Sequence, residues 1–375
     1  MDGHHTVMAG DDRGRGASER GAPAAPSSAG AAAALGVAAL AAVGAVALLS
    51  AFTRHRRRID LRDRVALVTG GSRGLGFLLA RRLADEGARV AICARDREDL
   101  ERARQMIWDD TGRDVLIFAC DLTDPEQPAS LFEYVRERLG PVEILVNNAG
   151  TIQVGPMDTM TEADFEGAFA LHFWAPYRMT QAALPDMRRN GFGRIVNISS
   201  IGGKVSVPHL LPYSASKFAL VGYSEGLRSE LLPEGIFVTT VCPGLMRTGS
   251  PRNAEFKGQH EKEYAWFALS DSLPGLSQSA DAAAERVLDA LVHGDAEVVT
   301  SLPAQILALV HGVFPGAVAD GLSLAQRFLP DPGGIGTGRR AGHQSETPLT
   351  RSPLTALTRR AEVDNNQRAG ANGHS

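Results

Sequence analysis

The stretch VALVTGGSRGLG, residues 65–76, decides the fold of this chain. Its first five residues form an apolar run that predicts a buried strand, and the amphipathic pattern over Leu75–Glu86 predicts a helix directly afterwards. Gly70 permits a tight turn between the two, while Gly74 and Gly76 let the backbone and the helix approach a pyrophosphate closely. The helix N-terminus offers free N–H groups and a positive dipole end to that phosphate. The stretch therefore predicts a dinucleotide-binding turn.

The chain repeats this alternation of strand and helix as far as residue 300. Amphipathic helical stretches include Glu98–Trp108 and Pro128–Leu139. The further predicted strands are short apolar runs: Val90–Ala94, Val115–Ala119, Ile144–Asn147, Ile195–Ile198, Val238–Val241 and Val298–Thr300. Such runs between helices indicate a parallel sheet covered on both faces, and right-handed crossovers make it doubly wound. We therefore predict one α/β domain of the Rossmann type over residues 59–300.

The end of the second predicted strand indicates which dinucleotide binds. Sites for NAD usually place a carboxylate there to hold the ribose hydroxyls. Here residues 92–95 read ICAR, and the first acid is Asp96. Arg73 in the glycine turn and Arg95 after the strand can both face a 2′-phosphate, which a guanidinium binds well. The alternative is a pair of solvated surface arginines. The pattern predicts NADP(H) in preference to NAD(H).

A serine, a tyrosine and a lysine follow in an order that suits proton transfer. Tyr213 and Lys217 are four residues apart at the start of a helical stretch, so they share one helix face. A phenol has an ordinary pKa of about 10, and a neighbouring ammonium stabilises the phenolate and lowers that pKa toward neutrality. Ser200 ends the preceding predicted strand, where its hydroxyl can polarise a substrate carbonyl. The alternative for the pair alone is an exposed couple on a helix.

With these motifs the chain resembles the short-chain dehydrogenase/reductase family over about residues 59–300. The resemblance implies an oxidoreductase that moves hydride between a nicotinamide and a carbonyl or alcohol carbon. It is carried by TGGSRGLG at 69–76, Asp121 in CDLTD, NNAG at 147–150, NISS at 197–200, YSASK at 213–217, and CPG at 242–244 with Thr248.

The resemblance assigns an expected role to each matching residue. Ser200 would orient the carbonyl, Tyr213 would be the general acid/base, and Lys217 would be its pKa partner and a ribose ligand. Asp121 and Leu122 would border the adenine. With the glycine turn and the two arginines, the expected cofactor-binding residues are Gly70, Ser72, Arg73, Gly74, Leu75, Gly76, Arg95, Asp121, Leu122, Asn148, Ala149, Gly150, Tyr213, Lys217, Pro243, Gly244 and Thr248.

One position departs from the family pattern. Family members usually carry an asparagine on the helix before the catalytic serine, where it orders a water of the proton relay. Counting back from the sequence TQAAL at 180–184, that position is His172. An imidazole can hydrogen-bond the same water and titrates near neutrality, so we predict a relay role for His172. The alternative is a core histidine.

The N-terminal sequence predicts a membrane anchor. Residues 1–30 predict a disordered tail, and residues 31–53 form a charge-free stretch that is long enough to cross a bilayer core as a helix. The region before the stretch is long for a cleaved signal peptide, and a flexible Ala-rich linker is the other alternative. Six arginines after the stretch against three before it predict a single-pass protein with a cytoplasmic catalytic domain: Arg54, Arg56, Arg57, Arg58, Arg62 and Arg64 against Arg13, Arg15 and Arg20.

By the same resemblance, Pro243, Gly244 and Thr248 would border the nicotinamide, and we call Pro243–Gly244 the nicotinamide-side turn; three predicted segments follow it. Leu245–Leu276 is predicted to form a substrate lid whose aromatic content suggests a lipophilic substrate, such as a fatty, isoprenoid or steroid-like carbonyl; ordinary packing is the alternative. Residues 301–331 predict a packed or surface-lying helical hairpin rather than a second span, because Pro303 and Pro315 interrupt it. Residues 332–375 are polar and Gly-rich and predict a disordered tail.

The composition and charge of the chain limit the kinds of ligand that the protein is expected to bind. A net charge of -4 over 375 residues and the lack of a basic aromatic stripe argue against nucleic acid. Cys93, Cys120 and Cys242 lie apart, which argues against a disulfide framework and a metal site. We predict an NADP(H)-dependent carbonyl reductase or alcohol dehydrogenase with a small-molecule substrate, and a homo-oligomer by analogy with the family. The alternatives are a non-catalytic NADP(H)-binding sensor or scaffold, and an epimerase, dehydratase or enoyl reductase.

Overall fold

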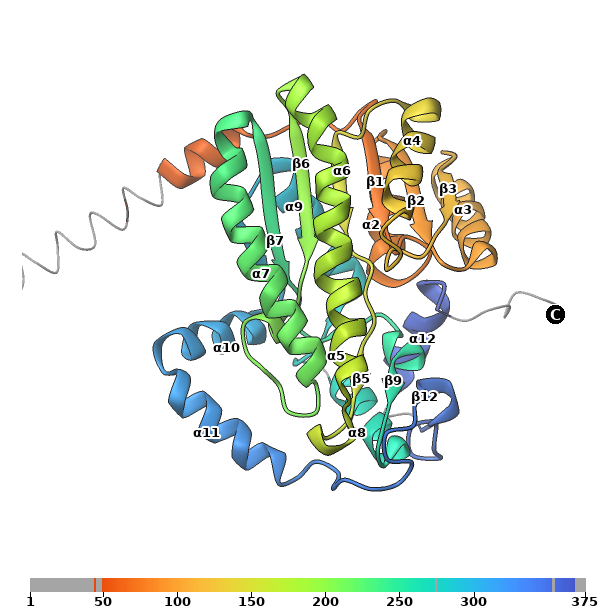
Figure 1. Ribbon diagram of the computed structural model, residues 1–375, viewed down its shortest axis with the longest axis vertical. Helices are drawn as coiled ribbons and strands as arrows, with labels where there is room; N and C mark the ends of the chain where they lie inside the picture. Colours follow the sequence, from red (N-terminus) through yellow and green to blue (C-terminus); the bar gives the residue numbers. More distant parts are fainter. Residues whose placement is uncertain (1–43, 45–48, 274, 353–354, 368–375) are drawn as a thin grey trace, which may run out of the picture. The chain divides into compact units, whose positions relative to one another are not determined.

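A seven-stranded parallel sheet forms the centre of the computed structural model, which describes residues 44, 49–273, 275–352 and 355–367 (Figure 1). The strands lie in the order β11-β7-β6-β4-β1-β2-β3, and every neighbouring pair is parallel. The strand order reverses between β1 and β4, so the predicted doubly wound Rossmann-type fold is confirmed. The strands are β1 (Val65–Thr69), β2 (Arg89–Ala94), β3 (Leu116–Ala119), β4 (Ile144–Asn147), β6 (Gly193–Ile198), β7 (Ile236–Cys242) and β11 (Glu297–Val299).

Helices cover both faces of the sheet (Figure 1). On one face, the apolar sides of α2 (Gly74–Asp85), α3 (Arg97–Thr111) and α9 (Ala280–His293) pack on the sheet. On the other face, α4 (Gln127–Leu139), α6 (Ala175–Asn190) and α7 (Leu211–Leu231) pack in the same way. Each strand carries Val, Ile and Leu toward both faces, because helices exclude water from both.

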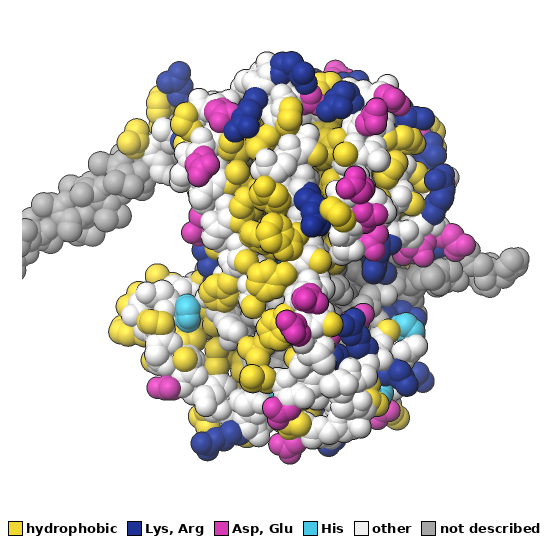
Figure 2. Space-filling model, viewed as in Figure 1, with side chains coloured by type: hydrophobic (Ala, Val, Ile, Leu, Met, Phe, Trp, Pro, Cys, Tyr) yellow, Lys and Arg dark blue, Asp and Glu magenta, His cyan; other side chains and the backbone are white. Residues whose placement is uncertain are grey.

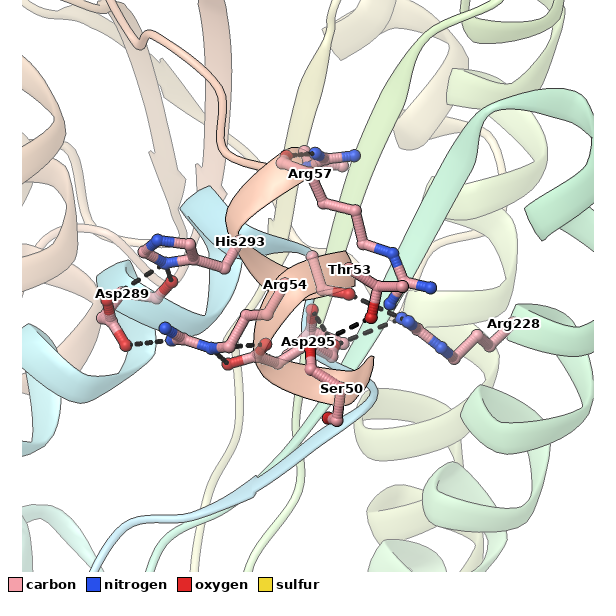
Figure 3. A network of polar contacts seen from close by, with 11 residues as sticks. Ser50, Thr53, Arg54, Arg57, Arg228, Asp289, His293 and Asp295 are labelled. Atoms are coloured by element: carbon pink, nitrogen blue, oxygen red, sulfur yellow. Dashed lines mark hydrogen bonds and ion pairs between the residues drawn. The ribbon is translucent and has the colours of Figure 1, made fainter. Parts of the chain in front are cut away.

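Arg54 and Ile59, which precede β1, bond to residues at the end of α9 and in the loop before β11. The guanidinium of Arg54 bonds the carboxylates of Asp295 and Asp289 (Figure 3), and the amide of Ile59 donates to the carbonyl of Val292. Of the arginines counted as a topology signal, Arg62 pairs with Asp60 and Arg64 with Glu143. Arg54 and Arg64 therefore also bind distant segments of the domain.

A smaller lobe lies beyond the carboxyl ends of the strands. It contains α8 (His260–Ser272) and the short strands β5 (Gln153–Val154), β8 (Met246–Arg247), β9 (Glu255–Phe256), β10 (Gln278–Ser279) and β12 (Arg340–Ala341). Its core holds Phe256, Tyr264 and Phe267, and the Phe256 ring lies 5.3 Å from that of Tyr264 and 6.0 Å from that of Phe267. The expectation that aromatic rings of the lid form a lipophilic substrate surface is wrong for these three, because they are buried against one another.

The C-terminal third contains more ordered structure than its composition suggests. Residues after β11 form α10 (Leu302–Val313) and α11 (Pro315–Gln326). The prediction of a disordered tail from residue 332 is wrong for the described part: β12 pairs with β9, and α12 (Ala356–Asp364) buries Thr358 and Glu362. This tail has little apolar sequence to form its own core, but its polar side chains bind the surface of the main domain.

No helix among the described residues combines the length and the apolar character needed to cross a membrane. The predicted tail at residues 1–30 lies outside the described residues, as does most of the predicted span at residues 31–53.

Candidate active site

The glycine turn between β1 and α2 has the shape that its sequence predicts. Gly70 and Gly74 have positive φ angles of 61° and 60°, which side chains other than glycine rarely adopt. A Cβ added at Gly76 would lie 2.3 Å from the carbonyl oxygen of Gly70 and from Nδ2 of Asn148. A side chain at position 76 is therefore incompatible with this turn.

Asn148 and Thr69 join the glycine turn to the neighbouring strand. The amide of Asn148 donates to Thr69 Oγ1 over 2.9 Å, and its side-chain Nδ2 donates to the carbonyls of Thr69 and Gly70 over 3.0 and 3.2 Å. The amide of Ala149 donates to the same Thr69 hydroxyl. The NNAG sequence thus holds the shape of the turn, with Gly150 packed against the ring of His172.

The two arginines expected to hold a 2′-phosphate lie near each other. The positive charge of Arg95 contributes to a lowered pKa of Arg73, after the larger effect of burial. The only ion pair of Arg73 with the described residues is with Asp99, at 3.8 Å, although the charge of Asp96 also acts on it. Arg95 is exposed and makes no hydrogen bond or ion pair with the described residues. Two nearby guanidinium groups without a close carboxylate partner fit an anionic group such as a phosphate.

The residues expected at the adenine end are held by local contacts. The carboxylate of Asp121 accepts from the amide and hydroxyl of Thr123 over 3.0 and 2.8 Å, and the amide of Asp121 donates to Gln127. Leu122 is buried in the core under α4. The glycine turn, the arginine pair and this rim are the residues that would hold a dinucleotide.

Ser200, Tyr213 and Lys217 meet at the carboxyl ends of β6 and β7. Ser200 Oγ hydrogen-bonds the Tyr213 hydroxyl, and it also accepts from the amide of Gly202 over 3.0 Å. Lys217 lies one turn along α7 from Tyr213, with its Nζ 5.7 Å from the centre of the tyrosine ring. That Nζ donates to the carbonyl of Ile198 over 2.8 Å. The three residues thus lie together at this edge of the sheet, with Lys217 buried and Ser200 and Tyr213 half-buried.

The electrostatics of this group differ from the sequence-based expectation. Burial raises the pKa of Tyr213 to about 12, while the hydrogen bond with Ser200 acts in the opposite direction. Burial lowers the pKa of Lys217 to about 8. In the protein alone, desolvation of the phenolate therefore outweighs stabilisation by the ammonium, and the phenol stays protonated at neutral pH.

His172 lies beside Tyr213, within a single π-helical turn, Ala170–Trp174, between α5 (Glu162–Phe169) and α6. Its ring meets the tyrosine ring edge to face, with centres 5.4 Å apart. The amide of Thr151 donates to Nε2 over 3.1 Å, and Nδ1 lies 2.8 Å from Ser216 Oγ. Because Nε2 accepts, the proton sits on Nδ1 and is donated to Ser216. Burial, followed by the charge of Lys217, holds the pKa of His172 well below its usual value, so the ring is neutral.

The C-terminal segment reaches the glycine turn, which the sequence reasoning missed. The amide of Gly74 donates to the carbonyl of Asn365 over 2.9 Å, and the side chain of Asn366 donates to the carbonyls of Ser72 and Asp99. Asn365 also bonds the carbonyl of Thr248, on the expected nicotinamide side. We call Asn365–Gln367 the C-terminal strap. Polar residues in a Gly-rich tail gave no signal of such a long-range contact.

The nicotinamide-side turn after β7 packs against the start of α10. The amide of Ile201 donates to the carbonyl of Pro243, and a Cβ added at Gly244 would lie 2.4 Å from Ser301 Oγ. A second missed residue, Asp271 on α8, is buried and close enough for its charge to affect Tyr213. Burial raises the pKa of Asp271 to about 8, although the charge of Arg247 opposes this.

Comparison with known proteins identifies the family. The sequence profile described as short chain dehydrogenase matches residues 64–257. Dehydrogenase/reductase SDR family member 7B of Danio rerio is 36% identical over 213 residues, which are 55% of this chain and 69% of that protein. Ketoacyl reductase HetN of Nostoc is 34% identical over 184 residues, 49% of this chain and 64% of that protein. The crystal structure of a short-chain dehydrogenase from Streptomyces avermitilis has a TM-score of 0.60 and 31% identity, covering 71% of this chain and 98% of that chain.

The chain belongs to the short-chain dehydrogenase/reductase family. It is a dehydrogenase/reductase enzyme, and members of this family bind a nicotinamide dinucleotide, NAD or NADP.

Proposed function

We propose that this protein is an NADP(H)-dependent carbonyl reductase or alcohol dehydrogenase in which Tyr213 is the general acid/base. The convergence of Ser200, Tyr213 and Lys217 beside the glycine turn is the observation that carries this proposal. The adjacent, poorly paired guanidinium groups of Arg73 and Arg95 support a 2′-phosphate, and hence NADP(H), as the bound form. Bound NADPH supplies the hydride that reduces the carbonyl carbon.

Each side chain has a separate task in the proposed reaction. The Ser200 hydroxyl donates a hydrogen bond to the substrate oxygen as negative charge develops there. Tyr213, which is protonated at neutral pH, donates its proton to that oxygen. Lys217 stabilises the resulting phenolate and binds the ribose, and its pKa of about 8 lets it exchange protons near neutral pH.

His172 extends the same hydrogen-bonded group in this proposal. Its Nδ1 is joined to Ser216 Oγ, and Ser216 in turn donates to the carbonyl of Tyr213 over 2.9 Å. His172 therefore fixes the start of α7 and the orientation of the tyrosine. A relay role additionally requires its Nε2 to exchange the Thr151 amide for a water.

We propose an acyl-chain or otherwise lipophilic carbonyl compound as the substrate class. The ketoacyl reductase relative acts, by its name, on such a carbonyl. The charge-free residues 31–53 would hold the enzyme in a membrane by one N-terminal helix, with the domain from residue 54 onward in the cytoplasm. Such an anchor would keep the active site close to lipophilic compounds.

A homo-oligomer is also part of the proposal. Aromatic side chains of α7, α6 and the adjoining π-helical turn form an exposed apolar patch in the middle of the view in Figure 2. The patch includes Trp174 and Tyr177, whose ring centres lie 5.8 Å apart. Exposed aromatic groups of this kind are typical of protein–protein contacts. Light scattering of the purified protein with and without Trp174→Glu tests this assembly.

Replacement of Tyr213 by Phe tests the catalytic proposal. We expect turnover of NADPH with a panel of long-chain ketones and aldehydes to fall by about 10²- to 10⁴-fold, because the proton donor is removed. Binding of NADPH, followed by its fluorescence, should stay unchanged. Tyr223→Phe, on the same helix, is the matched control and should keep full turnover.

Retained turnover in Tyr213→Phe would refute the assignment. Bound NADPH with no turnover in the unmodified protein would instead indicate a sensor or scaffold. His172→Asn introduces the residue that family members usually carry and should keep turnover within a fewfold of the unmodified enzyme.

A further inference from the structure

The helical hairpin α10–α11 exposes an unusually apolar surface. No charged residue lies between residues 298 and 319. Within α10 only Ala304 is buried, and within α11 no residue is. Leu309 and Phe314 are 69% and 61% exposed. A helix on the surface of a soluble protein normally buries one apolar stripe and presents polar groups outward. The hairpin lies at the lower left of the view in Figure 1, and the exposed fractions place large apolar side chains on its outer surface.

Both ends of the hairpin are fixed to loops of the active site. At its start, Ser301 and Ala304 pack on Gly244 of the nicotinamide-side turn. At its end, Gln326 Nε2 lies 2.9 Å from His209 Nε2, four residues before Tyr213. The other ring nitrogen of His209 bonds the carboxylate of Glu263 on α8 over 2.9 Å. The hairpin is therefore positioned by the two segments that flank the catalytic tyrosine.

Arg54 lies near the same edge of the sheet as the start of the hairpin. It is the first charged residue after the charge-free sequence 21–53, and its guanidinium bonds Asp295 and Asp289 (Figure 3). Asp295 lies two residues before β11, an edge strand of the sheet, and α10 starts at Leu302. Seven residues span at most about 25 Å. One surface along the β11 edge can therefore contact both Arg54 and the start of the hairpin.

The distribution of charge on the hairpin suits a lipid bilayer. The charge-free part comprises α10 and the tip around Phe314, and the first charged residues after it are Asp320 and Arg327 in and after α11. A shallowly inserted tip would leave these two groups in water or among headgroups. A protein interface would instead need a polar rim with hydrogen bonds, which this tip does not offer. Helices also satisfy their own backbone groups, as a lipid environment requires.

We propose that the α10–α11 hairpin is a lipid-binding surface whose tip, Leu309, Val310, Val313 and Phe314, inserts among the acyl chains of a bilayer. It is separate from the N-terminal segment and adjoins the substrate side of the active site. Its use as an entry path for a lipophilic carbonyl compound rests on the proposed function. The insertion itself does not, because it is measured without turnover.

Site-specific fluorescence on the full chain in lipid vesicles tests the proposal. Val313→Cys is labelled with an environment-sensitive dye, and the vesicles contain phosphatidylcholine and phosphatidylglycerol with nitroxide groups on their acyl chains. The native cysteines are buried, so labelling is directed to the new thiol. Ser130→Cys on α4, exposed on a different part of the domain, is the matched control. Both proteins share the same N-terminal segment.

We expect severalfold quenching of the dye at position 313 and none at position 130. Equal fluorescence at the two positions would overturn the proposal. Efficient disulfide crosslinking of Val313→Cys between two copies, without quenching, would also overturn it and assign the hairpin to a protein interface.

A charged variant separates insertion from the reductase proposal. Leu309→Glu with Phe314→Glu changes two exposed side chains that contact no catalytic residue, so turnover of a water-soluble ketone should stay unchanged. We expect this variant to lose most of the quenching of a dye at position 313. If quenching persists despite the two carboxylates, the tip is not inserted and the proposal is wrong. A failed reductase assay on every carbonyl compound would leave the quenching result intact.

Discussion

Residues 65–217 and residues 245–367 both contribute to the candidate site, and their structures depend on different kinds of contact. In the first region, the glycine turn, the strand-end serine and the tyrosine–lysine pair are each defined by a few consecutive residues. In the second region, aromatic residues form a core of their own, and a polar tail crosses to the glycine turn. The difference is that local backbone geometry decides the first region, whereas contacts between distant segments decide the second.

The largest expected effect comes from changing a glycine in the locally determined region. Gly76→Ala places a Cβ 2.3 Å from the Gly70 carbonyl oxygen, so the turn must open. We expect destabilisation by about 1–3 kcal/mol and loss of NADPH binding, measured by urea unfolding and fluorescence titration. Gly222→Ala on α7 meets nothing within 4 Å and should stabilise the protein by about 0.5–1 kcal/mol. If the two substitutions change stability and NADPH binding equally, the close contact between Gly76 and the Gly70 carbonyl does not matter for the turn.

The arginine pair gives the next largest effect. Arg73→Gln and Arg95→Gln each remove a charge that would bind the 2′-phosphate. We expect each to weaken NADPH binding by about 10- to 100-fold and to leave NADH binding unchanged, because a hydrogen bond to a charged group contributes about 1.5–3 kcal/mol. Arg97→Gln, which removes an exposed pair with Glu101, is the control. Equal losses for both dinucleotides would show that the arginines do not select NADP(H).

The C-terminal strap tests the region that depends on long-range contacts. Gly249 has a φ of 82°, and a Cβ there would lie 2.7 Å from Cα of Glu362 on α12. Gly249→Ala should displace α12 at a cost of about 1–2 kcal/mol and speed hydrogen exchange over residues 356–367. NADPH affinity should rise, because the carbonyl of Asn365 and a phosphate need the same Gly74 amide.

A control variant separates backbone strain from displacement of α12. Gly275 has a φ of 87°, and a Cβ there would meet nothing within 4 Å. Gly275→Ala therefore shares the strain without the clash and should leave exchange over residues 356–367 unchanged. Weaker NADPH binding in Gly249→Ala would instead mean that the strap supports the turn.

Asp271 should change how stability varies with pH, rather than the affinity for a dinucleotide. Its folded pKa of about 8 lies above the ordinary value of 3.8, so the folded state holds the proton more tightly than the unfolded state. The stabilisation from this group is complete below about pH 4 and is lost as pH rises toward 8, by at most about 1.4 kcal/mol per pH unit. Asp271→Asn should remove this slope in thermal unfolding measured across that range. If the stability of the two proteins varies with pH in the same way, the pKa of Asp271 is not raised in the folded state.

The sequence-based predictions are accurate where local backbone geometry decides the structure. Predicted strands begin and end within two residues of the observed ones, and α2, α3 and α4 begin one residue before their predicted starts. Short continuous apolar runs that alternate with amphipathic helices are typical of strands buried on both faces, and glycines with positive φ have few substitutes. Tyr213 and Lys217 share a helix face because the helical repeat requires it.

Other features depended on partners that lie far along the chain. Phe256 and Tyr264 looked like a substrate surface, but whether an aromatic ring faces a cleft or a core depends on what packs against it. The polar strap was taken for a disordered tail, because its partners, the carbonyls of Ser72 and Asp99, are more than 260 residues away. The raised pKa of Tyr213 follows from burial, which a spacing of four residues does not encode.

The sequence by itself determined the parallel sheet, the phosphate turn and the order of serine, tyrosine and lysine, because these depend on backbone conformation and on spacing along a strand or helix. Only the tertiary structure decided which side chains are desolvated, which nitrogen of His172 carries the proton, and that the C-terminal strap lies on the glycine turn. Solvent exclusion and contacts across the fold determine those properties, and both exist only once distant segments have come together.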